Sequence, residues 1–180
     1  MQALALAPAG DDRLLGGSIL DVMSHQATFA GRYTEAATLA RAALAGTRGL
    51  ATPTLPAHYH AMEARALARL HDTKACGHAL LETMSAFERT NPQDDPPWFQ
   101  YFNESEVAAE FGQCMRDLGR PADAIQHAQS ALGTTGEFVR SDFFVSLVLA
   151  DAHLAAGDID QACSVVLHAL TDFREHAVGG

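Results

Sequence analysis

Nine histidines and 22 acidic residues raise the question of metal or acid–base chemistry in this 180-residue sequence. His58 and His60 are two residues apart, so on a helix they point to nearly opposite sides and cannot chelate one ion. Six of the nine histidines have an acidic residue three or four positions away, but about four such spacings on helix faces arise by chance. The sequence has no H-E-x-x-H motif and no Cys/His cluster. We therefore expect no metal site and no cofactor.

Nucleophilic catalysis has no clear candidate in the sequence either. Ser24 and His25 are adjacent, and adjacent residues do not face each other on a helix. The sequence contains no G-x-S-x-G elbow and no Gly-rich phosphate loop. Cys114 has no histidine nearby in sequence that would activate its thiol. We expect no catalytic residues and a protein that is not an enzyme.

The cysteine and charge content favours a cytoplasmic protein. The three cysteines lie far apart, at positions 76, 114 and 163, without a C-x-x-C spacing, which is typical of reduced thiols. The 12 basic and 22 acidic residues give a formal charge of −10, which repels nucleic-acid phosphates and anionic membranes. The longest apolar stretch, 143–150, is too short to span a bilayer. We expect no direct nucleic-acid partner and no membrane partner.

The elements that must position the polar residues are helices. Apolar residues make up 48 % of the chain and charged residues 19 %, which excludes a disordered chain. Alanine dominates and aromatic residues are only 7 %, a composition that favours helices. Four segments repeat one pattern, in which a turn residue is followed five positions later by a small residue. They begin at Gly31, His71, Gly119 and Gly157.

An amphipathic run precedes each of these segments, so each unit is a helix, a tight turn and a second helix. Pro121 suits the first turn of a helix, and Asp158 can cap the last helix. The stretch 90–97, TNPQDDPP, should be irregular because of its prolines. The eight expected helices cover 13–30, 33–46, 54–70, 73–88, 98–118, 121–133, 138–156 and 159–176.

This pattern resembles the tetratricopeptide repeat (TPR), in which small residues let paired helices approach closely. Gly112, Ala64 and Ala150 match the small position of the first helix, and Gly31 and Tyr33 match the turn. The unit is longer than 34 residues, the first copy has Ser24 at the small position and the signature Trp is absent.

A second similarity is to the repeat region of actinobacterial helix-turn-helix transcriptional regulators, over about residues 11–177. It rests on the segments DDPPWFQYFNESEVAAEFGQCMRDLGRPADAIQHA and FVRSDFFVSLVLADAHLAAGDIDQACSV. No basic recognition helix precedes residue 11, so we expect the chain to be a fragment of a longer regulator.

These resemblances imply an all-α superhelix, or solenoid, of about four TPR-like helix pairs over residues 11–180. Residues 1–10 would be the end of a preceding helix or a disordered tail. The implied function is a ligand- or protein-binding module that shifts its curvature on binding and acts on an attached DNA-binding domain. The alternative is a free-standing scaffold that holds partner proteins.

The TPR register also implies which side chains line the concave groove. Arg65, Arg69 and Arg116 fall in the middle of it, and an arginine fork suits a carboxylate because it donates two parallel hydrogen bonds. We therefore expect a peptide, a small acidic ligand or a partner protein there. The alternative is that these arginines pair with local acids such as Glu63 or Asp117. The full implied set is Ser18, Asp21, His25, Thr28, His58, Arg65, Arg69, Glu106, Gln113, Arg116, Asp117 and Asp151.

Aromatic residues cluster just before the third helix pair, at Trp98, Phe99, Tyr101 and Phe102. They could form the wall of a ligand pocket or plug the gap left by the long loop. Arg140, which opens the last pair, presents the same two alternatives. The predicted ligand-binding residues are His25, Arg65, Arg69, Gln113, Arg116, Trp98, Tyr101 and Arg140.

The last helix carries a broad apolar stripe from Ile159 through Val165 and Val166 to Phe173. One neighbouring helix can cover only part of this stripe. We therefore expect a homodimer, most simply a two-fold one.

Overall fold

The computed structural model describes residues 12–99, 101–132 and 139–178, without the side chains of 139–140 and 175–178. The chain divides into two compact units, unit 1 (Met1–Phe102) and unit 2 (Asn103–Gly180). All regular structure in the described residues is helical, as the composition predicts. No helix in this part of the chain is long and apolar enough to cross a membrane.

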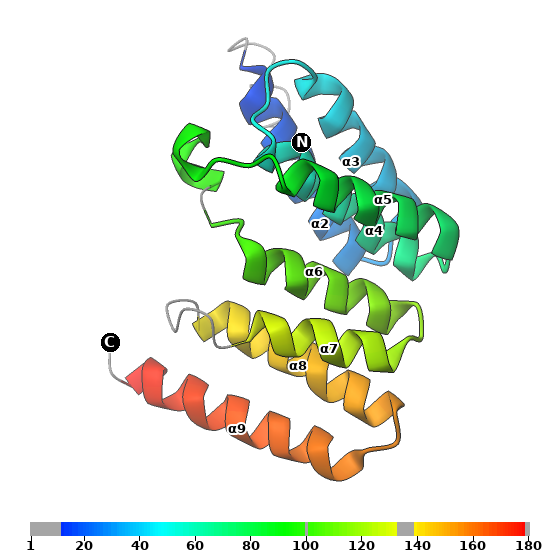
Figure 1. Ribbon diagram of the computed structural model, residues 1–180, viewed down its shortest axis with the longest axis vertical. Coiled ribbons are helices and arrows are strands. Elements are labelled where there is room, and N and C mark those ends of the chain that lie inside the picture. The colour runs from blue at the N-terminus through cyan, green and yellow to red at the C-terminus, as the bar shows by residue number, and fades with distance from the viewer. Residues whose placement is uncertain (1–11, 100, 133–138, 179–180) are drawn as a thin grey trace. The chain divides into compact units, whose positions relative to one another are not determined.

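Unit 1 contains two antiparallel helix pairs (Figure 1). Asp12 and Asp72 start the first and last of the four helices, because each carboxylate accepts a backbone N–H three residues on, from Leu15 and Ala75. The first helices of the two pairs, α2 and α4, contact each other directly. The helices are α2 (Arg13–Phe29), α3 (Tyr33–Thr47), α4 (Thr54–Arg69) and α5 (Thr73–Phe87).

Unit 2 repeats this arrangement with two further pairs. Asn103 caps the first helix by accepting the N–H groups of Ser105 and Glu106. Pro121 occupies the first turn of the second helix, and Asp158 accepts the N–H of Gln161 in the fourth, so both helix-start predictions are confirmed. The helices are α6 (Glu104–Asp117), α7 (Pro121–Ala131), α8 (Val139–Ala155) and α9 (Ile159–Val178).

The four turn residues identified from the sequence share one backbone conformation. Gly31, His71, Gly119 and Gly157 have φ between +56° and +83°, the left-handed region that glycine favours. The following residue donates its N–H to the carbonyl five positions back, as Arg32 does to Ala27 at 2.8 Å. This is the Schellman geometry that ends a helix and reverses the chain.

The repeated small residues hold each pair together. Ala36, Cys76 and Ala124 are fully buried in the second helices, and Ala162 is 8 % exposed. A Cβ added at Gly112 would lie 3.3 Å from the backbone nitrogen of Ala128 in α7. The predicted close approach of the third pair is therefore confirmed.

The segment before α6 differs from the expected helix over 98–118. α6 begins only at Glu104, because Asn103 caps it there. The preceding residues form two short 3₁₀ turns, η1 (Pro92–Asp94) and η2 (Pro97–Phe99). The prolines exclude an α-helix, as expected, but they fit the first position of a tighter turn.

Candidate functional site

A buried acid–histidine pair joins α2 to α4 in unit 1. Asp21 and His58 are only 2 % and 8 % exposed. The Nδ1 atom of His58 lies 3.0 Å from each carboxylate oxygen of Asp21. A carboxylate at Nδ1 holds the proton on that nitrogen of a neutral imidazole, so Nε2 is left as an acceptor.

The other side of His58 faces a group of aromatic rings. The hydroxyl of Tyr101 lies 3.4 Å from Nε2. The rings of Phe99 and Phe102 meet the imidazole edge to face, with centroids 5.2 and 4.8 Å away. A polar row of carboxylate, imidazole and phenol therefore crosses an otherwise apolar environment.

A second buried acid fixes the segment that carries these rings. Asp95 is 7 % exposed and accepts hydrogen bonds from the hydroxyls of Thr52 and Thr54, at 2.5 and 2.6 Å. Thr54 is the first residue of α4. These bonds attach the loop at Asp95 to the start of α4, the helix that also carries His58.

Further along, the same two helices carry four more side chains that take part in ring or cation contacts. The rings of His25 and Phe29 pack against each other, with their centroids 4.9 Å apart. The guanidinium of Arg65 also lies over the Phe29 ring, 5.6 Å from its centroid. One turn on, Arg69 donates to the hydroxyl of Tyr33 at 2.7 and 3.1 Å. We call Asp21, His25, Phe29, His58, Arg65 and Arg69 the α2–α4 stripe.

Exposure divides this stripe into a buried part and an accessible part. Arg65 is 6 % exposed, whereas Phe29 is 71 % exposed, and Arg69 is exposed as well. Val22, one turn before His25, is 53 % exposed. α2 thus offers exposed apolar side chains, and α4 offers an exposed guanidinium that donates to Tyr33.

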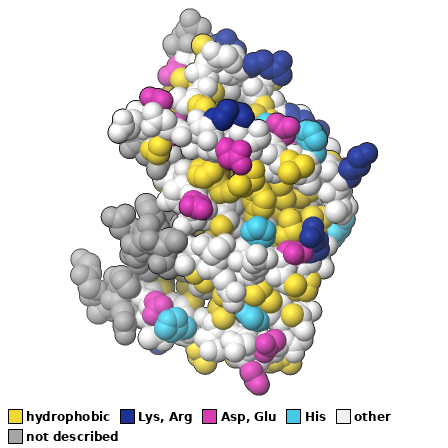
Figure 2. All heavy atoms as spheres, viewed as in Figure 1, with side chains coloured by type: hydrophobic (Ala, Val, Ile, Leu, Met, Phe, Trp, Pro, Cys, Tyr) yellow, Lys and Arg dark blue, Asp and Glu magenta, His cyan; other side chains and the backbone are white. Residues whose placement is uncertain are grey.

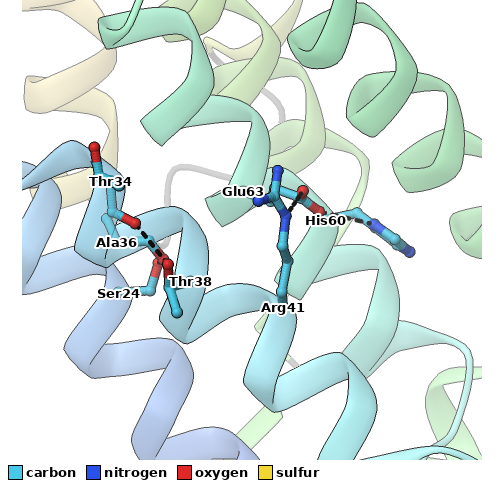
Figure 3. A network of polar contacts seen from close by, with 7 residues as sticks. All are labelled: Ser24, Thr34, Ala36, Thr38, Arg41, His60 and Glu63. Carbon is cyan, nitrogen blue, oxygen red and sulfur yellow. Dashed lines mark hydrogen bonds and ion pairs between the residues drawn. The ribbon is translucent and has the colours of Figure 1, made fainter.

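A neighbouring network links α3 to α4 (Figure 3). Arg41 donates to Glu63 at 2.6 Å, and the Nδ1 atom of His60 lies 3.7 Å from the same carboxylate. Burial would raise the pKa of Glu63, but His60 and Arg41 outweigh it and lower this pKa below its usual value. Glu63 therefore does not pair with the predicted groove arginines.

Tyr59 in α4 is a buried titratable group on another side of the helix. It is fully buried, and this burial raises the pKa of its phenol above the ordinary value. A Cβ added at Gly17 would lie 3.0 Å from its hydroxyl. The glycine in α2 therefore leaves room for this ring.

In unit 2 the structure brings together three residues of the predicted groove. Arg116 of α6 contacts its neighbour Asp117 at 2.9 Å and Asp151 of α8 at 3.6 Å. The local pairing of Arg116 with an acid is thus confirmed. Gln113 is half-buried in α6, and the side chain of Arg140 lies outside the described part of the chain.

The aromatic cluster divides by burial, and the ligand-pocket alternative stays a prediction. Phe99 and Phe102 are 3 % and 5 % exposed and plug the segment after α5, whereas Trp98 and Tyr101 are 52 % and 43 % exposed. Within the described residues no three His, Cys, Asp or Glu side chains are grouped to hold a metal ion.

Sequence reasoning placed Asp21 and His58 in one groove but did not foresee that they pair. It missed Phe29 and Asp95. Phe29 lies one helical turn after His25, which is a detectable signal. The Asp95 contacts span more than 40 residues, and no local pattern marks them.

Comparison with known proteins adds no relative: no family model, no curated protein and no solved structure matches this chain.

Proposed function

We propose that this chain is a non-enzymatic binding module, the regulatory region of a transcriptional regulator, and that its ligand binds on the accessible part of the α2–α4 stripe. The observation that carries the proposal is the alignment of α2 with α4. Asp21 lies against His58, and Phe29 against Arg65. Asp21, His58 and Arg65, which the TPR register assigns to one surface, thus lie along the contact of two helices, together with Phe29.

The ligand class follows from the groups that this surface presents. Arg69 supplies an exposed guanidinium, a group that suits a carboxylate, and its Nε and Nη2 atoms donate to Tyr33. Phe29 and Val22 supply exposed apolar area on α2. A peptide with a free C-terminus, or a small acid with an apolar group, supplies both a carboxylate for Arg69 and an apolar group for the exposed apolar side chains. The net charge of −10 makes direct binding of nucleic acid unfavourable.

A structural role for the acid–histidine pair supports the non-enzymatic interpretation. Nε2 of His58 is directed at a phenol, between the buried rings of Phe99 and Phe102. In this position the imidazole ties the aromatic segment to α2 through Asp21. Ligand contact with Tyr101 would therefore reach both helices of the stripe.

The test is a thermal-shift screen followed by calorimetry on the full chain. Probes are phenylacetate, succinate and short peptides that end in phenylalanine with a free or an amidated C-terminus. We expect the free-acid probes to bind and Arg69→Ala to weaken binding at least tenfold, since a hydrogen bond to a charged group contributes about 1.5–3 kcal/mol.

Arg120→Ala is the matched control, because Arg120 is also exposed but pairs with Asp123 at the start of α7. This variant should bind as the parent does. Arg65 is a poor test residue, since it is 6 % exposed and its loss would disturb packing. Unchanged affinity in Arg69→Ala would contradict the proposed site.

A further inference from the structure

The last helix, α9, has two different flanks. Its inner face packs on α8, with Ala162 and Ala169 buried and the ring of Phe173 5.0 Å from that of Phe143. At 100° per residue, one flank beside this face carries Cys163, Leu167 and Leu170, and the other carries polar side chains. Ile159, Leu167 and Leu170 are 61 %, 66 % and 44 % exposed, and Cys163 is exposed too.

Part of the same flank is covered in the preceding repeat. Aligning the turn residues Gly119 and Gly157 places Ile125 of α7 and its C-cap residue Leu132 at the positions of Cys163 and Leu170, and the exposed Gln129 at that of Leu167. Ile125 and Leu132 pack against the core cluster that contains Val145, Val148 and Leu149 of α8. Two positions of this flank therefore pack against a following helix in the preceding repeat, and α9 has no such helix in the described part of the chain.

The charged residues along this flank of α9 indicate which kind of helix can pack against it. The exposed row on α9 runs Asp160, Cys163, Leu167, Leu170, Arg174. Its acidic and basic ends each lie seven residues from Leu167. A two-fold axis at Leu167 would bring each Asp160 near Arg174 of the other chain, in an antiparallel pair whose helix dipoles also oppose each other.

We propose that this flank of α9 binds the same flank in a second copy of the chain, in an antiparallel pair that crosses near Leu167. The inference does not depend on the ligand site of unit 1. Because each chain carries a charge of −10, the copies repel each other at long range, and added salt should screen that repulsion.

The first test is sedimentation equilibrium of the full chain at tens of micromolar. We expect a dimer from 50 to 300 mM NaCl, because salt screens both the net repulsion and the Asp160–Arg174 attraction. Leu167→Asp should weaken association at least tenfold while the helical circular dichroism signal stays the same, since Leu167 is exposed. A monomer throughout this range overturns the proposal.

A cysteine test locates the interface. In a Cys163→Ser background, Leu167→Cys should give a disulfide-linked dimer on mild oxidation, because the two-fold axis brings the two thiols together. Gln161→Cys in the same background is the matched control on the polar flank and should stay monomeric on a non-reducing gel. Cross-linking at 161 but not at 167 overturns the proposal.

A charge exchange tests the register. Asp160→Arg and Arg174→Asp should each weaken the dimer about tenfold, because each places like charges opposite each other. The double variant should recover most of the parental affinity. A double variant as weak as the single ones overturns the antiparallel register.

Discussion

Units 1 and 2 share one helix-pair plan but use different residues within it. Unit 1 buries polar groups, with Asp21, His58 and Asp95 each at most 8 % exposed. Unit 2 buries one acid, Glu110 at 7 % exposed, and has a cluster of aliphatic residues that includes Val145, Val148 and Leu149. Eight of the 12 basic residues lie in unit 1, whereas 12 of the 22 acidic residues lie in unit 2. On the face in Figure 2, the dark blue side chains lie mostly where Figure 1 places α2–α5.

This difference bears on which unit carries the proposed ligand site. Buried ionisable pairs seldom add stability compared with apolar side chains of similar size. The helix pair itself requires only small residues at the crossings, as unit 2 shows with Gly112 and Ala124. The polar row of unit 1 is thus more than the helix crossings require, and the proposed ligand site lies beside it.

The largest expected effect comes from splitting the buried pair of unit 1. His58→Leu removes the imidazole from the buried Asp21 carboxylate and should cost about 3–5 kcal/mol in the free energy of unfolding. Asp21→Leu together with His58→Leu should cost much less, because no buried charge is left over. Urea unfolding of Asp21→Leu, His58→Leu and the double variant checks this. A double variant as unstable as the sum of the two single variants would show that the pair is not coupled.

The next effect concerns packing in unit 2. Gly112→Leu overpacks the crossing of α6 and α7 and should cost about 1–3 kcal/mol. Gly77→Leu in α5 is the matched control, because a Cβ there meets nothing within 4 Å. This control should be neutral or stabilising, since leucine favours a helix over glycine by up to about 1 kcal/mol. If Gly112→Leu has the same melting temperature as the parent, the assignment of a close crossing between α6 and α7 is wrong.

A smaller effect should appear at the second turn of unit 1. His71 has φ +56°, where the other three turns have glycine. His71→Gly should relieve the left-handed conformation and stabilise the chain by about 0.5–1 kcal/mol. Gly119→Ala makes the opposite change in unit 2 and should destabilise it by a similar amount. Thermal melts of the two variants should therefore shift in opposite directions.

The smallest effect depends on pH. The pKa of Glu63 is lowered in the folded chain, so its stabilisation is present above the unfolded-state pKa and is lost as pH falls through the folded value. Glu63→Gln should flatten the fall of stability in acid and cost less than about 1 kcal/mol at neutral pH. Glu82→Gln, at an exposed glutamate of α5, is the control. An acid slope unchanged by Glu63→Gln would contradict the assignment.

Local signals explain why the helices could be predicted from the sequence. Helix ends depend on residues within one helical turn, such as the turn glycines, Pro121 and Asp158. In the structure these residues lie at the helix ends where the sequence predicts them. The pairing of Asp21 with His58 depends on how α2 and α4 align, and no local sequence pattern predicts that alignment. Asp95 and Tyr101 reach α4 from more than 40 residues away, so the attachment of this segment was not foreseen.

One measurement tests the central claim most directly, that ligand recognition lies in unit 1. A two-dimensional ¹H–¹⁵N NMR titration of the full chain would use the carboxylate probe with the largest thermal shift. The account predicts amide shifts concentrated in α2 and α4, with the imidazole signals of His25 and His58 moving at the same ligand concentrations. Shifts concentrated in α6 to α9, or no shift with any carboxylate probe at millimolar concentration, would contradict it.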